Sequence, residues 1–250
     1  MPKLTDQFSQ ASNAYRDFRP DYPEALYRYL ATLSPSTELV WDCGCGNGQA
    51  SIALADHFDR VFATDISDNQ IAHATSRPNI TYRVSPAEHV ALHDSSVDLV
   101  TVAQAIHWFD HSRFFAEVSR VLKPGGVLAA WGYQLLHTGT TLDDIVAEFH
   151  SQVIGPYWPK GRELLDEGYT KIPLPYPREK TPAFSMEKQW HFDHLIGYLN
   201  TWSAVKSYEA DRGRNPVSLY SDRFLQAWGA PESEKPVSWP LILYVGIKSA

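Results

Sequence analysis

Cysteine is scarce in this chain, which has two in 250 residues. They are Cys43 and Cys45, and two residues this close along a chain do not meet the geometry of a disulfide. A chain of this length buries enough apolar surface to fold without disulfides or a structural metal. The scarcity therefore excludes a disulfide-stapled scaffold and predicts a reducing, cytoplasmic location.

Long hydrophobic runs are also absent. A membrane-spanning helix takes roughly 20 consecutive apolar residues, and the sequence contains no such run. The opening residues, Met1 to Asp6, show no basic segment followed by an apolar one, which a secretory signal would have. We therefore expect neither a secretion signal nor a membrane partner.

Dense basic segments are missing too, and the net charge is −7. Residues 1–154 hold 10 Lys and Arg against 18 Asp and Glu, whereas residues 155–250 hold 12 against 11. A nucleic-acid-binding protein concentrates basic groups to neutralise phosphates. We therefore expect a small-molecule partner and no nucleic acid. The acidic first half favours a cationic ligand.

What the chain does contain is a glycine-rich segment, Leu39 to Gly48, in which an apolar run meets Asp42 and then three glycines at alternate positions. A helical stretch, Gln49 to His57, follows at once. Glycines at the tip of a parallel strand let the backbone approach a nucleoside ligand without a Cβ in the way. The spacing differs from the dinucleotide fingerprint, whose third glycine would fall on Gln49. A carboxylate at this place repels a pyrophosphate and attracts an ammonium group.

This arrangement resembles the class I S-adenosylmethionine (SAM) methyltransferases, whose first motif is D-x-G-x-G-x-G. Asp42, Gly44, Gly46 and Gly48 match it. Cys43 departs from the pattern, since relatives usually carry Leu, Val or Ile there, and this affects packing more than chemistry.

Later segments follow in the order that the family would place them. Residues 60–65 form a second short apolar strand that ends in Asp65, where an acid can accept hydrogen bonds from both ribose hydroxyls. Residues 78–88 are expected to form a third strand and its exit loop beside the adenine. Residues 97–105 are a nearly continuous apolar run, as in a strand buried on both faces, and the resemblance places Gln104 near the sulfur of the cofactor.

The N-terminal segment also resembles a part of one group of relatives, the trans-aconitate methyltransferase type. Tyr15, Arg19 and Tyr22 match its Y-x-x-x-R-P-x-Y-P pattern, and in those enzymes the segment folds over the methionine end of the cofactor. Arg19 would then bind the methionine carboxylate through a charge-assisted hydrogen bond. In the alternative interpretation, Arg19 and Tyr22 only fix a helix to the sheet.

The resemblance implies that SAM is the cofactor and S-adenosylhomocysteine (SAH) the product. It implies a cofactor site made of Arg19, Asp42, Gly44, Gly46, Gly48, Asp65, Ile66, Ala87, Glu88 and Gln104.

Short strands and helices alternate over residues 39–133, which predicts an α/β fold with a parallel sheet. The resemblance implies a Rossmann-like, seven-stranded, mostly parallel sheet with helices on both faces and an antiparallel last strand. We expect one compact domain with a SAM-binding core over residues 1–154, a proline-rich substrate region or lid over 155–238, and a returning strand over 239–250. Further elements are expected at Thr141–Ile154, Glu187–Phe192, Leu195–Tyr208 and Trp239–Lys248.

His107 is the candidate catalytic residue, because it follows the fourth strand beside Gln104. An imidazole there can serve as a general base, or it can shape the acceptor pocket together with Trp108. His107 and His111 have an H-x-x-x-H spacing, but the glutamate of H-E-x-x-H is missing, so we expect no metal.

Three functions follow from this sequence. The first is methylation of a carboxylate oxygen, giving a methyl ester. It rests on the resemblance to the trans-aconitate type and on basic residues available in the second half. The second is N-, C- or phenolic O-methylation of a natural product, for which His107 would act as the base. The third is a non-catalytic SAM-binding module.

We expect a monomer or homodimer. The candidate substrate-binding residues are Tyr15, Tyr22, His107, Trp108, Tyr133, Trp202 and Ser203, and the candidate basic anchors are Arg162, Lys171, Arg178, Lys206, Arg212 and Arg214.

Overall fold

A computed structural model describes residues 18–249 of the chain. The chain forms two compact units that interleave along the sequence. Within the described residues, unit 1 comprises residues 18–21, 134–162 and 185–240, and unit 2 comprises residues 22–133, 163–184 and 241–249. These boundaries follow spatial packing, and the expected division at residues 154 and 238 stays a prediction.

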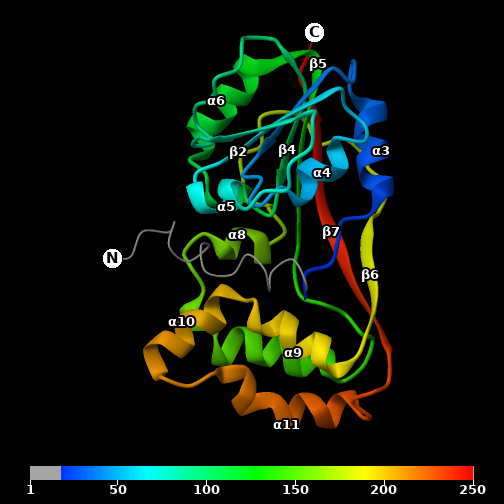
Figure 1. The fold of residues 1–250 in the computed structure, drawn as a ribbon, viewed down its shortest axis with the longest axis vertical. Helices are drawn as coiled ribbons and strands as arrows, with labels where there is room; N and C mark the ends of the chain where they lie inside the picture. The colour runs from blue at the N-terminus through cyan, green and yellow to red at the C-terminus, as the bar shows by residue number, and fades with distance from the viewer. Residues whose placement is uncertain (1–17, 250) are drawn as a thin grey trace. The chain divides into compact units, whose positions relative to one another are not determined.

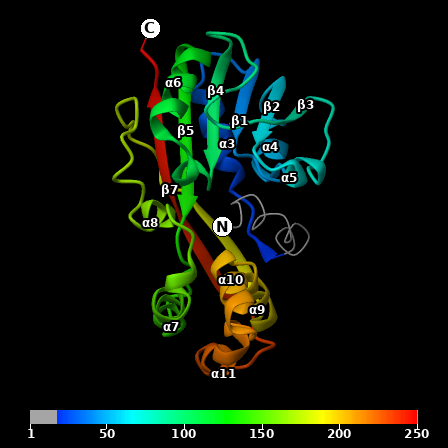
Figure 2. The same cartoon turned by 90° about the vertical axis from the view of Figure 1, so that its left-hand side faces the viewer.

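Unit 2 is built on five parallel strands. They are β1 (Leu39–Cys43), β2 (Arg60–Asp65), β3 (Ile80–Val84), β4 (Val97–Ala103) and β5 (Leu122–Tyr133). All of β1 and the first six residues of β4 are buried, because these central strands are covered on both faces. The strands lie side by side in the order β3-β2-β1-β4-β5 (Figure 2).

Helices cover both faces of this sheet, as expected. α3 (Glu24–Leu33) and α4 (Gln49–Leu54) pack on one face, and α6 (His111–Val121) packs on the other (Figure 1). The side chain of Asp110 caps α6 by accepting a hydrogen bond from the amide of Arg113, and this confirms the expected N-terminus of the helix. Two short helices, α5 (Asp68–Ala72) and α8 (Arg162–Asp166), complete the set.

The sheet ends in two antiparallel strands, and its full order is β3-β2-β1-β4-β5-β7-β6. β7 (Lys235–Ile247) contributes to both units: its first part pairs with β6 (Ser185–Trp190) in unit 1, and its second part pairs with β5 in unit 2. This confirms the seven-stranded fold. β7 begins four residues before the expected Trp239, because residues 235–240 pair with β6; Pro236 and Pro240 are tolerated there, since this part of β7 does not pair with β5.

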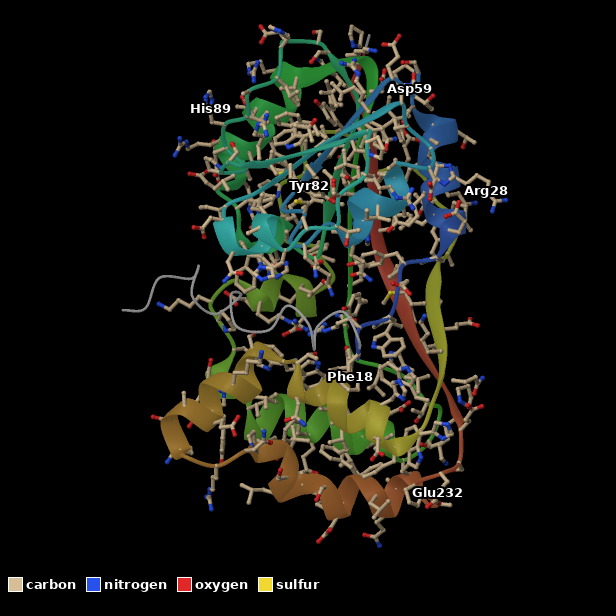
Figure 3. All side chains as sticks on the ribbon, in the orientation of Figure 1. Phe18, Arg28, Asp59, Tyr82, His89 and Glu232 are labelled. Carbon is tan, nitrogen blue, oxygen red and sulfur yellow. The ribbon has the colours of Figure 1, made fainter. Side chains whose placement is uncertain are left out.

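Unit 1 is mainly helical. α9 (Phe192–Asn200) and α10 (Ser203–Arg212) occupy the region where one helix was expected, at Leu195–Tyr208, so that prediction was wrong. The helix breaks at Trp202, whose backbone is extended, and the hydroxyl of Thr201 donates to the carbonyl of Tyr198 at 2.6 Å. The aromatic ring of Phe18, labelled in Figure 3, packs on Gly197 of α9.

Two further elements of unit 1 compare differently with expectation. The helical stretch expected over Thr141–Ile154 is confirmed as α7 (Leu142–Glu148), which continues directly into a π-helical turn, η2 (Phe149–Val153). α11 (Pro216–Trp228) was missed, although Asn215 caps it, Pro216 occupies its first position and Gly229 follows it. These are typical start and stop signals of a helix.

The remaining segments follow the expected composition rules. Between residues 155 and 182 the structure contains only the short η3 (Gly155–Tyr157) and α8, which agrees with the proline content of that region. Cys43 and Cys45 are buried and not bonded to each other. None of the helices within residues 18–249 is long and apolar enough to cross a membrane.

Candidate functional site

The glycine loop between β1 and α4 adopts a backbone that favours glycine. Gly44, Gly46 and Gly48 all have positive φ, at 69°, 55° and 89°. A Cβ on Gly44 would lie 2.6 Å from the Cβ of Ala105, and one on Gly48 would collide with the Tyr82 hydroxyl. A Cβ on Gly46 would instead make only an ordinary contact, 4.0 Å from Gln70 Oε1, among the described residues. Gly46 therefore forms a shallow backbone cradle that a side chain would fill.

Asp65 lies at the end of β2 and faces this loop. One carboxylate oxygen accepts a hydrogen bond from the amide of Gly46 at 2.8 Å, and the other accepts one from the amide of Ser67 at 2.9 Å. Burial raises the pKa of Asp65, and the hydrogen bonds from backbone amides act against this. A carboxylate has about four acceptor positions, so Asp65 retains the capacity to bind two hydroxyl groups.

Apolar side chains stand exposed next to Asp65. Ile66 is 63% exposed and Val84 is 54% exposed. They are two of the three large hydrophobic residues that are exposed in the described part of the chain. Val84 pairs with Asp65 in the register of β2 and β3. Exposed aliphatic side chains beside the Asp65 carboxylate suit contact with the flat face of a heterocyclic base.

Asp42 is fully buried under the glycine loop. One oxygen accepts a hydrogen bond from Ser51 at 2.6 Å, and the other accepts one from Thr101 at 2.9 Å. Burial raises the pKa of Asp42 to about 6, while these hydroxyl groups act to lower it. Asp42 thus ties β1 to α4 and β4, which positions the loop, and direct contact with an ammonium group stays a prediction.

The loop after β3 carries Ala87 and Glu88. Ala87 is buried, and the Glu88 carboxylate accepts a hydrogen bond from the amide of Asp110 at 2.9 Å. This bond connects the loop to the start of α6. The loops after β1, β2, β3 and β4 together form what we call the cofactor edge of unit 2. Ligands of open α/β sheets bind at this kind of edge.

Gln104 follows β4 in an unusual conformation. Its φ is 55°, a left-handed value that non-glycine residues rarely adopt. Its side-chain NH₂ donates to the carbonyl of Tyr133 at 3.2 Å, while its Oε1 atom is buried without a hydrogen-bond partner among the described residues. A buried acceptor left in this way is costly, and it marks a place where a bound donor would be stabilised.

His107 and Trp108 lie in a short 3-10 turn, η1 (Ile106–Trp108), directly after Gln104. His107 is 6% exposed, its ring centroid lies 4.3 Å from that of Trp108, and its Nδ1 lies 3.3 Å from the hydroxyl oxygen of Tyr169. His111 points elsewhere, since its Nε2 lies 2.9 Å from the carbonyl oxygen of Ile106. No group of three metal-ligating side chains occurs within the described residues.

This geometry fits a nucleoside cofactor with a cationic, amino-acid-like tail. The cradle at Gly46 leaves room for backbone approach, Asp65 retains acceptor positions, and Gln104 Oε1, which has no partner among the described residues, can accept a donor. The acidic groups Asp42 and Asp65 suit a positively charged ligand.

Comparison with known proteins identifies the family. A profile described as a methyltransferase domain matches residues 41–130. A Dictyostelium discoideum protein named as a methyltransferase is 31% identical over 253 residues, covering 98% of this chain and 96% of that protein. The chain belongs to the class I SAM-dependent methyltransferases.

Other relatives agree with this assignment. The structure of a protein named as a type II methyltransferase from Anaeromyxobacter dehalogenans superposes with a TM-score of 0.86 at 40% identity, covering 93% of this chain and all of that one. A Saccharomyces cerevisiae protein named as a SAM-dependent methyltransferase is 32% identical over 145 residues, covering 53% of this chain and 49% of that one. SAM is therefore the cofactor of this methyltransferase.

The remaining candidate residues of the methyltransferase are distributed over both units. In unit 2, the ring of Tyr22 packs edge-on against Trp131 and beside Tyr133. This contact fixes the start of α3 to β5, as the alternative interpretation of Tyr22 expects. Tyr133 is buried and its carbonyl accepts the bond from Gln104.

In unit 1, the guanidinium of Arg19 donates to the Thr201 hydroxyl at 3.0 Å and lies 5.0 Å from the Tyr198 ring centroid. Trp202 is 4% exposed, and Ser203 begins α10. Tyr15 lies outside the described residues. The proposed ligand roles of these residues stay predictions.

Two residues near these candidate side chains were missed from the sequence, Val84 at the cofactor edge and Tyr169 beside His107. Val84 closes the expected third strand, and an apolar residue at the exposed end of a strand is the signal that could have drawn attention to it. Tyr169 lies more than 60 residues after His107, and no sequence pattern relates the two.

Proposed function

We propose that this methyltransferase transfers the methyl group of SAM to a carboxylate oxygen of a small molecule, forming a methyl ester. The observation that carries the proposal is a pair of cations in unit 1. Lys206 on α10 is half-buried and forms no ion pair with the described residues, and its pKa is lowered by burial and by the charge of Arg19. Two cations held close together in partly apolar surroundings favour an anionic ligand.

The other candidate anchors differ from Lys206 in their surroundings. Lys171 pairs with Glu167 at 2.6 Å, and Arg212 pairs with Asp211 at 3.0 Å. Arg214 is exposed. The guanidinium groups of Arg162 and Arg178 lie over the rings of Trp158 and Tyr244. Lys206 is thus the candidate anchor whose burial and neighbouring cation best suit a carboxylate.

We infer the following roles at the cofactor edge. Asp65 accepts hydrogen bonds from the ribose hydroxyls, Ile66 and Val84 contact a face of the adenine, and Ala87 and Glu88 lie along its edge. The backbone at Gly46 approaches the cofactor closely, and Gln104 Oε1 accepts a donor from its methionine end. Bound SAM supplies a methyl group on a positively charged sulfur.

The chemistry asks mainly for positioning. A carboxylate is ionised at neutral pH, so its oxygen forms the new bond to the methyl carbon as the carbon–sulfur bond breaks, with the electron pair left on sulfur and no proton to remove. Holding reactants in line contributes effective molarities on the order of 10⁵–10⁸ M. The residues of this chain therefore act by binding, orienting and excluding water.

The proposal is tested by incubating the protein with methyl-tritiated SAM and separate panels of small carboxylic acids, amines and phenols. We expect label to enter the acids and to be released as volatile methanol on alkaline treatment, because esters hydrolyse in base. Label in an amine or phenol that resists base would contradict it. Lys206→Ala should raise the KM for the acid roughly tenfold, and Lys160→Ala, an exposed lysine of the same unit, should not.

A second candidate function is methylation of an amine, carbon or phenol that must first lose a proton. The buried contact between His107 and Tyr169 favours it, since an imidazole next to a phenol can serve as a general base. In that case kcat should rise with pH through the titration of the base, whereas an ionised carboxylate needs no such step.

Location and assembly belong to the proposal as well. We infer a cytoplasmic protein, supported by two buried, unbonded cysteines, and a small-molecule acceptor, supported by the net charge of −7. Light scattering after size-exclusion chromatography tests the expected monomer or homodimer.

A further inference from the structure

Two strained residues of unit 2 converge on one glycine. Among the described residues, Ser95, Gln104 and Tyr169 are the non-glycine residues with positive φ. A Cβ placed on Gly132 would lie 2.6 Å from the Tyr169 hydroxyl oxygen and 2.8 Å from Gln104 Oε1. The missing side chain of Gly132 thus leaves room above β5 for two polar groups. Strained backbone of this kind persists where the surrounding structure requires it, often at functional sites.

The turn after α8 directs Tyr169 inward. Gly168 and Tyr169 both have left-handed φ, at 69° and 60°, and the amide of Tyr169 donates to the carbonyl of Leu164 at 2.8 Å. This turn closes the helix and leaves the Tyr169 side chain 1% exposed. The strain at Tyr169 therefore serves to bury a phenol that a solvent-facing turn would leave in water.

The buried phenol meets the imidazole of His107. Its oxygen lies 3.3 Å from Nδ1, and the two rings are nearly parallel, with centroids 6.0 Å apart and an angle of 25°. A phenol O–H is a donor, and the unprotonated nitrogen of a neutral imidazole is an acceptor, so the hydroxyl can donate to this nitrogen. The partner of one ring nitrogen decides which nitrogen carries the proton.

We propose that Tyr169 is a positioning residue for methyl transfer, whose hydroxyl donates to His107 Nδ1. His107 then carries its proton on Nε2 and acts as a hydrogen-bond donor. A hydrogen-bond donor suits an anionic methyl acceptor. This role of His107 towards the methyl acceptor rests on the proposed carboxylate function. The tautomer and its control by Tyr169 rest only on the geometry of unit 2.

The test is a long-range ¹H–¹⁵N NMR spectrum of the ¹⁵N-labelled protein with SAH, in which His107 is assigned by its loss in His107→Gln. We expect a single tautomer protonated on Nε2. In Tyr169→Phe, which keeps the ring and removes only the hydroxyl, we expect a mixture of tautomers or a switch to Nδ1. Tyr176→Phe is the matched control, because its hydroxyl contacts Ser119 at 3.1 Å instead.

Two results would overturn the proposal. One is a wild-type protein in which His107 is protonated on Nδ1. This measurement uses the wild-type protein alone, so it does not depend on the folding of a variant. The other is an unchanged tautomer in a Tyr169→Phe protein that binds SAH as tightly as wild type. With any acceptor found in the tritium assay, kcat of Tyr169→Phe should fall about fivefold to tenfold. If carboxylates fail as acceptors while Tyr169 still sets the Nε2 tautomer, the proposed function fails and this inference stands.

Discussion

The cofactor edge of unit 2 and the cation pair of unit 1 are assembled from different kinds of information. At the cofactor edge, Gly46 lies in the loop after β1 and Asp65 ends the neighbouring parallel strand β2, and the amide of Gly46 donates to the Asp65 carboxylate at 2.8 Å. In unit 1, Arg19 meets Thr201 across 182 positions of the sequence. A parallel sheet brings strand ends together by rule, whereas helices in unit 1 bring residues together through packing that no short pattern describes. This difference explains why the cofactor was easier to predict than the methyl acceptor.

The largest effect is expected at the cofactor edge, and it distinguishes this region from the cation pair of unit 1. Asp65→Ala removes the proposed acceptor of both ribose hydroxyls, and each such bond would contribute roughly 1.5–3 kcal/mol. We expect the Kd for SAH to rise roughly 100-fold or more, measured by isothermal titration calorimetry. Asp68→Ala, which removes an exposed acid three residues later, serves as the control. An affinity within twofold of wild type would show that β2 does not carry the ribose contact. Lys206→Ala should leave the Kd for SAH within twofold of wild type, because Lys206 is proposed to bind the methyl acceptor and not the cofactor.

A smaller effect is expected from the glycine loop itself. Gly48→Ala should lower the free energy of unfolding by about 3 kcal/mol, because it combines a left-handed φ with a collision at Tyr82. Gly139 in unit 1 has a φ of 69° with open space around it, so Gly139→Ala should cost only about 1 kcal/mol. Urea denaturation measures both. Equal losses would mean that Tyr82 moves aside without cost.

The buried acid beneath the loop predicts a dependence on pH. The pKa of Asp42 in the folded protein, about 6, lies above its ordinary value of 3.8. As pH rises through this window the unfolded chain loses its proton first, so ionisation of Asp42 destabilises the folded state progressively, by up to about 3 kcal/mol at pH 7. Asp42→Asn removes this contribution.

Unfolding in urea at several pH values from 4 to 7 measures this contribution as the difference between wild type and Asp42→Asn. We expect the stability of wild type relative to the variant to fall as pH rises and to level off near pH 7. A constant difference would show that Asp42 keeps its ordinary pKa in the folded protein.

The smallest effect concerns unit 1. Asn215 caps α11 by accepting hydrogen bonds from the amides of Val217 and Ser218. Asn215→Ala should lower the free energy of unfolding by about 1 kcal/mol and leave the Kd for SAH unchanged. A loss of SAH affinity would show that the two regions are energetically coupled.

Local patterns predicted much of the fold. The alternating strands and helices over residues 39–133 and the cap at Asp110 are confirmed by the structure, as is the antiparallel last strand that the family resemblance implied. The helix break at Trp202 was not predicted, because the apolar spacing continues across it while an extended backbone interrupts the hydrogen bonds. α11 was missed although its cap and its closing glycine are local signals, so that failure was one of interpretation.

The sequence alone was enough to predict the class I methyltransferase family, the SAM cofactor and a seven-stranded, mostly parallel sheet. These depend on residues that are neighbours along the chain or lie at the ends of consecutive strands, where backbone geometry limits the outcome. The three-dimensional fold was needed to show that buried Asp42 connects three elements, that Gln104 Oε1 has no hydrogen-bond partner among the described residues, and that Tyr169 contacts His107. Such contacts arise when side chains distant in sequence share one packed interior, and their distances follow from the whole fold.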